Sequence, residues 1–504
     1  MKSLLLAIVS FLSISMPITA GEIKLPVCYS VLKNGLRIIM VPDTNVAVVS
    51  CRLYYFVGSM YESTGFTGLS HMYEHMMFKG TKKLGTANYA AEVPLMSAID
   101  SLDRLLYLRE QAAGDSDFIA QKYLKQRSSF LDKQRKYIKK DEIWELYQNS
   151  GATNLNAWTA DDMTAYIVTL PKNKVELFYW IESDRMHNPV LREFTSERDV
   201  VMEERRMRYD NRPEGRYWER LNALFYIADP YRNPTIGWAS DIRAFTRQKL
   251  EQHIHRYYTP DNAVIVLVGN IDTLRAIKDI RHYFGAIPRA SVPKEEVLTR
   301  EPAPIGETRF TVYDDAAPRI DMLFHTPGYP DNVLYKMDVL EGVFSGRSGR
   351  LYRRLVDKEG TCTNAGAENN PRLNDSYFHV WAEIKNDADP AKVERSIREE
   401  ISRAASAPPT ADEIRRITNE IRMAFVTDLN SLEGLSDRLA WFERLRSWKD
   451  IFTYPDRIAS VKTEEIPSAV KQYLDPGRMT VGILLQQTKD TAEIKPGKTH
   501  SSEH

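Results

Sequence analysis

The chain has 504 residues, of which 43% are hydrophobic and 27% are charged, and its 68 Lys and Arg balance its 68 Asp and Glu. At about 100–200 residues per domain, this length predicts two to four domains, and the composition excludes a disordered chain, a collagen-like repeat and a coiled-coil array. The balanced charge leaves no basic surplus for a nucleic acid backbone, so we expect no nucleic acid partner. The three scattered cysteines exclude a disulfide framework and a cysteine zinc site, so any metal must use His and carboxylates.

Residues 1–20 differ in composition from the rest of the chain. Lys2 gives a positive start, residues 4–18 are mostly apolar, and Ala20 is a small residue at the expected cleavage point. This pattern predicts a secretory signal peptide cleaved after Ala20, and hence export across the inner membrane to the periplasm. The alternative is an uncleaved anchor, but the apolar run is shorter than the roughly 20 residues of a spanning helix. The later sequence offers no candidate, so we expect no stable membrane span.

Residues 21–286 are predicted to form an N-terminal unit. Its strands and helices are indicated by alternating apolar residues and by apolar residues at helical spacing. The expected elements are strands at 36–41, 47–57, 163–170 and 263–268 and helices near 69–79 and 175–186.

The most informative motif is His71-Met72-Tyr73-Glu74-His75. On a helix, residues four apart share a face, so His71 and His75 can present two imidazole nitrogens to one ion, with Glu74 close enough to accept a proton from water. A catalytic zinc keeps three protein ligands, so one more acidic or imidazole ligand is required. The alternative is a pair of core histidines beside a surface Glu.

A segment of about residues 92–148 has no counterpart in the second half of the chain. Its apolar residues fall at helical spacing between Leu95 and Ile138 and are interrupted at residues 114–116. The pattern predicts an inserted helical hairpin. The insertion either covers the site or docks a partner, or it is a surface elaboration packed on its own unit. We favour the last interpretation because amphipathic stripes most often face a core.

The third ligand is expected from a helix over residues 196–207. Glu197 and Glu204 are seven residues apart, or two helical turns, so they share a face, whereas Glu203 points about 100° away. Taken alone, this charged run is more typical of a solvated helix face.

The second half of the chain repeats the order of the first. Prolines and polar residues cluster over residues 287–306, which predicts a linker. A C-terminal unit is expected over residues 307–490, followed by a polar tail over 491–504. The repeated order predicts two copies of one α+β unit. The elements expected in the second copy are strands at 310–313, 320–325, 377–384 and 479–485 and helices at 334–356 and 393–401.

The His71–His75 motif, its flanks at residues 68–70 and 76–81, and the stretch from Glu197 to Glu204 together resemble the insulinase/pitrilysin-like inverzincin zinc metallopeptidases. The similarity is greatest to the bacterial members that are like mitochondrial processing peptidase, and it extends through both units. The resemblance implies two homologous α/β-roll units joined by a linker, of which only the first is catalytic.

The resemblance also implies roles for individual residues. One Zn²⁺ per chain is expected on His71, His75 and Glu204, with Glu74 as the general base and Glu197 as a supporting catalytic carboxylate.

Residues 151–159 resemble the edge strand on which such enzymes bind an extended peptide. Asn156, Ala157 and Trp158 are therefore expected to bind the peptide substrate, because backbone pairing lets an exposed edge take up diverse sequences. The alternative is a plain loop before the next strand.

One departure from the family concerns the second unit. Members usually carry an Arg and a Tyr, seven residues apart, that contact substrate near the zinc, and Val356 and Thr363 stand at these positions here. We therefore expect a partner chain, in a homodimer or in a heterodimer with a homologous zinc-free subunit. In a homodimer a nearby residue would act instead, and the candidates are Arg350, Tyr352, Arg353 and Arg354.

These expectations describe a secreted zinc metalloendopeptidase that hydrolyses peptides or unfolded segments bound as an extended strand. The alternative is a non-catalytic peptide-binding or assembly subunit of the same fold. The intact ligand set favours the enzyme, because function is argued from the site and not from the fold.

Overall fold

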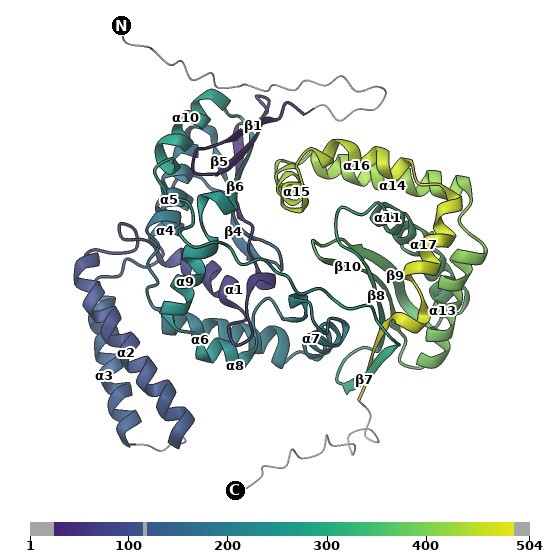
Figure 1. Cartoon of the computed structure of the whole chain (residues 1–504), viewed down its shortest axis with the longest axis horizontal. Helices are drawn as coiled ribbons and strands as arrows, with labels where there is room; N and C mark the ends of the chain where they lie inside the picture. Colours follow the sequence, from purple (N-terminus) through teal and green to yellow (C-terminus); the bar gives the residue numbers. More distant parts are fainter. Residues whose placement is uncertain (1–24, 114–117, 488–504) are drawn as a thin grey trace.

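The computed structural model describes residues 25–113 and 118–487, which form two α+β units, each built around one mixed sheet (Figure 1). The predicted fold class is confirmed. The expected signal peptide and the expected polar tail lie outside the described residues.

The first sheet has the strand order β1-β2-β6-β3-β5-β4. Strands β2 and β6 are parallel, and the other neighbours are antiparallel. One face packs on the unit's own helices α1, α5, α9 and α10 through a large apolar core. The strands are β1 (Cys28–Val31), β2 (Arg37–Pro42), β3 (Val48–Tyr55), β4 (Thr153–Thr159), β5 (Thr164–Pro171) and β6 (Ala263–Gly269). The helices are α1 (Leu69–Met76), α5 (Val175–His187), α6 (Phe194–Arg205), α8 (Ala239–Ala244), α9 (Arg247–Tyr257) and α10 (Thr273–Phe284).

The second sheet, with order β7-β11-β8-β10-β9, repeats the first without a counterpart of β1. Strands β7 and β11 are parallel, as β2 and β6 are, and β9 lies at the edge, as β4 does. The predicted duplication of one unit is therefore confirmed. The strands are β7 (Thr308–Asp314), β8 (Arg319–Pro327), β9 (Cys362–Asn370), β10 (Asp375–Ile384) and β11 (Thr480–Gln486). The helices on its first face are α11 (Val333–Phe344), α13 (Pro390–Ser406), α14 (Ala411–Leu429) and α17 (Ile466–Tyr473), with α16 (Asp450–Ala459) beside them.

The two units exchange one helix each. Helix α7 (Pro213–Phe225) of the first unit packs on the free face of the second sheet, and α15 (Leu432–Leu445) of the second unit packs on the free face of the first (Figure 1). The α7 contact includes a hydrogen bond of 2.7 Å from the Tyr217 hydroxyl to Asp321 in β8. Because each sheet needs the other unit's helix to bury its second face, this exchange fastens the units together.

One predicted helix is wrong in its length. The sequence predicts a single helix over residues 334–356, but α11 ends at Phe344. Gly346 has φ of 74°, and a Cβ at Gly349 would lie 2.3 Å from the Ser345 carbonyl oxygen. The chain can turn tightly here only because both residues are glycine. The short helix α12 (Arg350–Tyr352) and a π-helical turn, Arg353–Lys358, then lead into β9.

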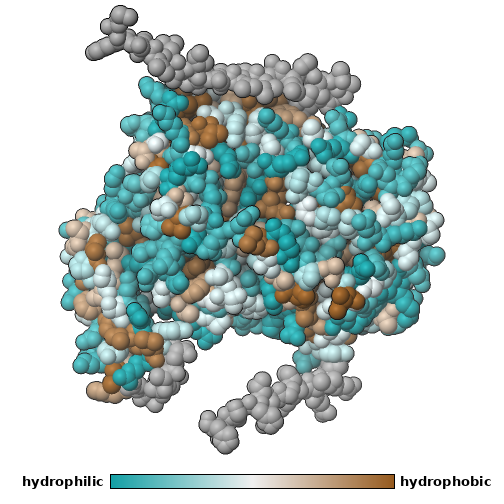
Figure 2. All heavy atoms as spheres, viewed as in Figure 1, coloured by the Kyte–Doolittle hydropathy of each residue, from teal (hydrophilic) through white to brown (hydrophobic). Residues whose placement is uncertain are grey.

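The insertion is a helical hairpin, as predicted. Helix α2 (Tyr89–Ala113) packs against α3 (Phe118–Arg135), and the pair projects from the first unit (Figure 1). A buried ion pair of 2.8 Å between Glu92 and Arg192 anchors its base. Farther out, Leu108 and Phe118 are exposed, and Figure 2 shows apolar (brown) atoms on the surface of the projecting hairpin. The expectation that the insertion packs on its own unit thus holds as far as the middle of α2, where Asp100 pairs with Arg247 and Asp103 accepts a hydrogen bond from Thr195, but not farther out. Helix α4 (Glu142–Asn149) leads back to β4.

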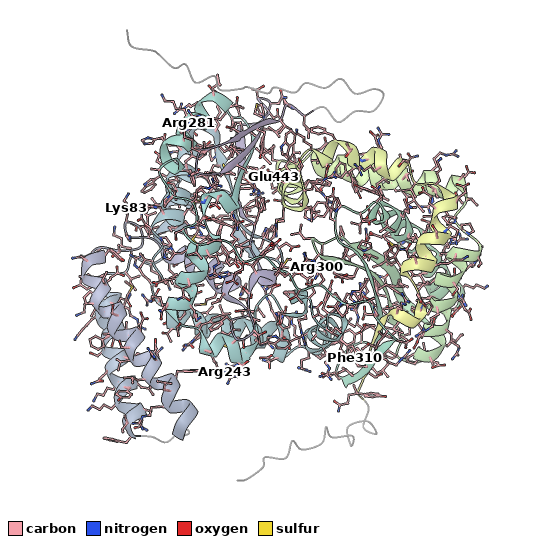
Figure 3. The ribbon with its side chains drawn as sticks, viewed as in Figure 1. Lys83, Arg243, Arg281, Arg300, Phe310 and Glu443 are labelled. Atoms are coloured by element: carbon pink, nitrogen blue, oxygen red, sulfur yellow. The ribbon has the colours of Figure 1, made fainter. Side chains whose placement is uncertain are left out.

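A cavity of about 930 Å³ lies between the two units, lined by residues of both. Its lining includes Arg300, from the extended segment between α10 and β7, and Glu443 of α15. Figure 3 labels both residues in the region where the two units face each other. Within the described ranges, no helix has the length and apolar character needed to cross a bilayer.

Candidate metal centre

Helix α1 carries the motif and is fixed at its first turn by a buried carboxylate. Glu62 accepts hydrogen bonds from the backbone N–H groups of Gly68 (2.5 Å) and Ser70 (2.6 Å). These bonds satisfy donors that a helix N-terminus leaves without partners. Burial raises the pKa of Glu62 to about 7, although the two hydrogen bonds oppose the shift. Gly68 has φ of 96°, and a Cβ there would lie 2.4 Å from the Ile236 carbonyl oxygen. The start of α1 is therefore held against the chain before α8.

The structure brings His71, His75 and Glu204 together. One ligand atom from each lies within 4.8 Å of the others. The Oε2 atom of Glu204 is 3.6 Å from His71 Nε2 and 3.2 Å from His75 Nε2. The i, i+4 spacing places both rings on one face of α1, and α6 presents the carboxylate from the opposite side.

Glu197 also contacts this cluster. It lies on the same face of α6 as Glu204, as the seven-residue spacing predicts. Its Oε1 lies 3.0 Å from His75 Nδ1, and its Oε2 forms an ion pair of 2.6 Å with Lys79. A carboxylate on the second ring nitrogen fixes the orientation of an imidazole ligand. By contrast, Glu203 points away and pairs with Arg206 at 2.9 Å.

Glu74 is held by a residue that the sequence did not single out. The Thr159 hydroxyl, at the end of β4, donates a hydrogen bond of 2.7 Å to Glu74 Oε2. Burial raises the pKa of Glu74, and the Thr159 hydrogen bond and the charge of His75 oppose this shift. The only signal in the sequence is that Thr159 ends the predicted edge strand.

The charges of the cluster favour a bound cation. Burial, together with neighbouring His75, lowers the pKa of His71 to about 4, so this imidazole is neutral near pH 7. Burial also lowers the pKa of His75, but Glu197 and Glu204 outweigh it and raise the value to about 9. The two carboxylates thus attract a positive charge, which a divalent cation would supply in place of the His75 proton. Two imidazole nitrogens and one carboxylate oxygen suit zinc, so the residues fit this ion.

The expected substrate strand is β4, at the edge of the first sheet. It pairs with β5 and carries a register shift before Asn156. Asn156 is exposed and Ala157 is buried, while Trp158 packs edge-on against Tyr54 with ring centroids 6.0 Å apart. One edge of β4 is thus paired with β5, and its other edge has no strand beside it within the described sheet. Thr159, which contacts Glu74, lies at the end of the strand.

The positions at which the family usually carries an Arg and a Tyr, Val356 and Thr363, lie in the turn before β9 and in β9. Val356 packs against the second core, and the exposed Thr363 lies 3.3 Å from Glu383 on the neighbouring strand. Of the nearby alternatives, Arg350 pairs with Glu413 at 3.0 Å. Arg354 is likewise engaged, in an ion pair of 2.8 Å with Glu359. Both arginines therefore serve the second unit's own packing.

Two family models match the chain. The insulinase model (peptidase family M16) matches residues 37–101, which contain the His71–His75 motif, and the peptidase M16 inactive-domain model matches residues 244–421.

Similar proteins span most of the chain. The zinc protease PqqE of Helicobacter pylori is 22% identical over 462 residues, which cover 90% of this chain and 91% of that protein. An uncharacterized zinc protease of Rickettsia bellii is 24% identical over 401 residues, covering 78% and 81%.

Solved structures share the fold. A protease from Helicobacter pylori aligns with a TM-score of 0.76 at 22% identity, covering 91% of this chain and 99% of that chain. The periplasmic protease PqqL of Escherichia coli aligns with a TM-score of 0.70 at 17% identity, covering 95% of this chain but 50% of that chain. The motif, the duplicated fold and these matches agree, and the chain belongs to the insulinase family of peptidases, family M16.

Proposed function

We propose that this protein is a zinc-dependent endopeptidase that cleaves peptides or unfolded polypeptide segments. The observation that carries the proposal is the convergence of His71, His75 and Glu204 within 4.8 Å. Glu74 lies beside them on α1 and is oriented by Thr159. Relatives named zinc proteases support the same activity.

The residues have separate roles in the reaction. Zinc, when bound, polarises the peptide carbonyl and lowers the pKa of a coordinated water. Glu74 accepts a proton from the water whose oxygen adds to the carbonyl carbon, and it returns that proton to the nitrogen as the C–N bond breaks. Glu197 keeps the His75 ring in place, and Thr159 keeps the carboxylate of Glu74 in place. One water is consumed and two peptide products leave.

The substrate is proposed to bind as an extended strand along β4. The edge position of β4 supports this, because an exposed edge offers backbone donors and acceptors to any sequence. Asn156, Ala157 and Trp158 would pair with the peptide through their backbone, close to the Glu74 contact at Thr159.

We further propose a partner chain and export. Pairing with a second chain of the same fold, either a copy of this one or a zinc-free homologue, is supported by the match to half of the PqqL chain. Export to the periplasm is supported by the signal pattern of residues 1–20.

The test is cleavage of a quenched-fluorescence peptide library by the full chain with zinc. The wild-type chain should cut, and Glu74→Gln should be slower by at least about 10³-fold while it retains zinc. Equal cleavage by the two proteins would show a contaminating protease or another mechanism. Peptide binding by the wild type without any cleavage would instead favour the non-catalytic subunit.

A further inference from the structure

We propose that Arg208 is a catalytic residue: its guanidinium contacts the carbonyl oxygen of the scissile bond and stabilises the negative charge that develops there. This inference rests on the proposed peptidase function and adds to it a residue outside the His71–His75 motif and the Glu197–Glu204 helix.

Arg208 is placed by the turn that follows α6. The helix runs directly into a π-helical turn, Arg206–Asp210. Arg208 lies four residues after Glu204, and its Nη1 is 3.1 Å from Glu204 Oε1. The other oxygen of the same carboxylate, Oε2, faces His71 and His75. The guanidinium therefore sits against the outer oxygen of the third ligand.

Arg208 is open to solvent, whereas the carboxylate that it contacts is mostly covered. Its side chain is 68% exposed, against 15% for Glu204. An ion pair that is this exposed contributes at most about 1 kcal/mol, so little free energy holds the guanidinium on Glu204 alone. The side chain can therefore turn a donor toward a substrate oxygen without leaving the site.

The charge of Arg208 reaches the reacting groups as well as the ligand. Burial is the main influence on the pKa values of Glu74 and His71, and the positive charge of Arg208 lowers both. The positive charge of Arg208 thus acts on the proposed base and on one imidazole as well as on the carboxylate that it contacts. This is the region in which the peptide carbonyl must lie if Glu74 activates its attacking water.

The neighbouring cations are engaged elsewhere. Lys79 is bound to Glu197 at 2.6 Å. Arg205 is buried and donates to the Gly237 carbonyl oxygen at 2.8 Å. Arg206 pairs with the outward-facing Glu203. Among the described residues of α1, α6 and the turn after α6, Arg208 alone combines high exposure with contact to a proposed ligand.

A guanidinium suits this role chemically. It is charged at all relevant pH values and carries several N–H donors. A preorganised donor is most effective where negative charge develops in the transition state. With Arg208, the chain has its own cation at the site and does not depend on a partner to supply one.

The test uses full-length, zinc-loaded protein and a defined peptide that the wild type cleaves. Arg208→Gln should lower kcat/KM by about 30-fold, mainly through kcat, because the contact strengthens only in the transition state. Arg208→Lys should recover part of the loss. Arg206→Gln is the matched control, since Arg206 lies in the same turn and is 57% exposed, and it should stay within about twofold of the wild type.

Two further measurements separate this role from a structural one. Zinc content should be the same in wild type, Arg208→Gln and Arg206→Gln. In a Glu74→Gln background, Arg208→Gln should change the affinity for the uncleaved peptide, measured by fluorescence anisotropy, by less than about threefold.

Several results would overturn the inference. An active wild type with Arg208→Gln within about threefold of it would remove Arg208 from the reaction. Zinc loss in Arg208→Gln would make it a positioning residue for Glu204. A fall in peptide affinity as large as the fall in kcat/KM would mean ground-state binding, for example of a substrate carboxylate. An inactive wild type would overturn the proposed function and this inference together.

Discussion

By their place in the order of elements, α11 and α14 of the second unit correspond to α1 and α6 of the first, but the two pairs differ in character. In the first unit, α1 and α6 face each other through His71, His75 and Glu204. In the second, α11 contains no histidine, and Gly342 packs so closely on α14 that a Cβ there would lie 2.3 Å from Ile417 Cγ2. The first pair brings polar side chains together, and the second makes a close apolar contact at Gly342 and Ile417. The duplicated fold therefore supplies the scaffold twice, but the side chains make a site only once.

The acidic residues of the two units also differ in their surroundings. In the first unit, Glu197 and Glu204 of the metal cluster are paired with His75 and Lys79. In the second, Asp338 and Glu341 of α11 line a cavity of about 450 Å³, and burial raises their pKa values to about 6 and about 7. The first arrangement keeps carboxylates charged for a cation, whereas the second favours their protonated forms.

The largest expected effect is on metal affinity in the first unit. His71→Ala and Glu204→Gln each remove one of three ligands and should weaken zinc binding by about 10³-fold or more, as measured by chelator competition. Glu203→Gln, one residue from the ligand but facing away, should bind zinc as the wild type does. Zinc loss in Glu203→Gln with retention in Glu204→Gln would contradict the arrangement of α6.

A smaller effect is expected from the carboxylate behind His75. Glu197→Gln keeps all three ligands but loses the charge that orients the ring, so zinc affinity should fall by about 10- to 100-fold. The same competition assay measures it. An affinity equal to that of the wild type would show that Lys79 and Glu197 form only a surface ion pair.

A substitution at the contact between α11 and α14 should change the stability of the fold and leave metal binding unchanged. Gly342→Ala would normally strengthen a helix, yet here the methyl group meets Ile417, so we expect a loss of about 1–3 kcal/mol in the free energy of unfolding. Urea denaturation measures the loss, and Ile417→Leu in the same chain should recover part of it. Zinc content should not change. Stabilisation by Gly342→Ala would contradict the close contact.

The smallest effect concerns pH and the second-unit cavity. The pKa of Glu341 is raised from 4.5 to about 7, so the folded state holds this proton more tightly than the unfolded state. Its contribution to stability is present below pH 4.5 and is lost as the pH rises through about 7. Glu341→Gln should therefore match the wild type near pH 4 and exceed it at pH 8 by on the order of 1–2 kcal/mol. Melting curves across this range test it, with Glu464→Gln as control, because Glu464 is exposed and lies outside this cavity. A constant difference at all pH values would count against the assignment.

The parts of the site that the sequence predicted are those fixed by local geometry. The i, i+4 histidines and the seven-residue spacing of Glu197 and Glu204 follow from helix periodicity, so their faces were predictable. The repeated order of elements predicted two units, and the position of β4 at the sheet edge followed from the resemblance.

The remaining features depend on contacts distant in the sequence. The Thr159 contact with Glu74 joins positions 85 residues apart, and no periodicity predicts it. The exchange of α7 and α15 depends on the approach of two sheets. The sequence predicts too long a helix for α11 because the apolar residues continue at helical spacing past Phe344. The chain instead turns at Gly346 and Gly349, which the apolar pattern does not reveal.

The most direct test of the account is metal removal and restoration on the purified full chain. Zinc should be present at one ion per chain by mass spectrometry, peptide cleavage should stop when a chelator removes it, and added zinc should restore cleavage. Glu74→Gln should lose and regain zinc in the same cycle, and with zinc bound its cleavage should stay at least about 10³-fold below that of the wild type. Cleavage that persists in metal-free protein would contradict the central claim that His71, His75 and Glu204 hold the ion on which the reaction depends.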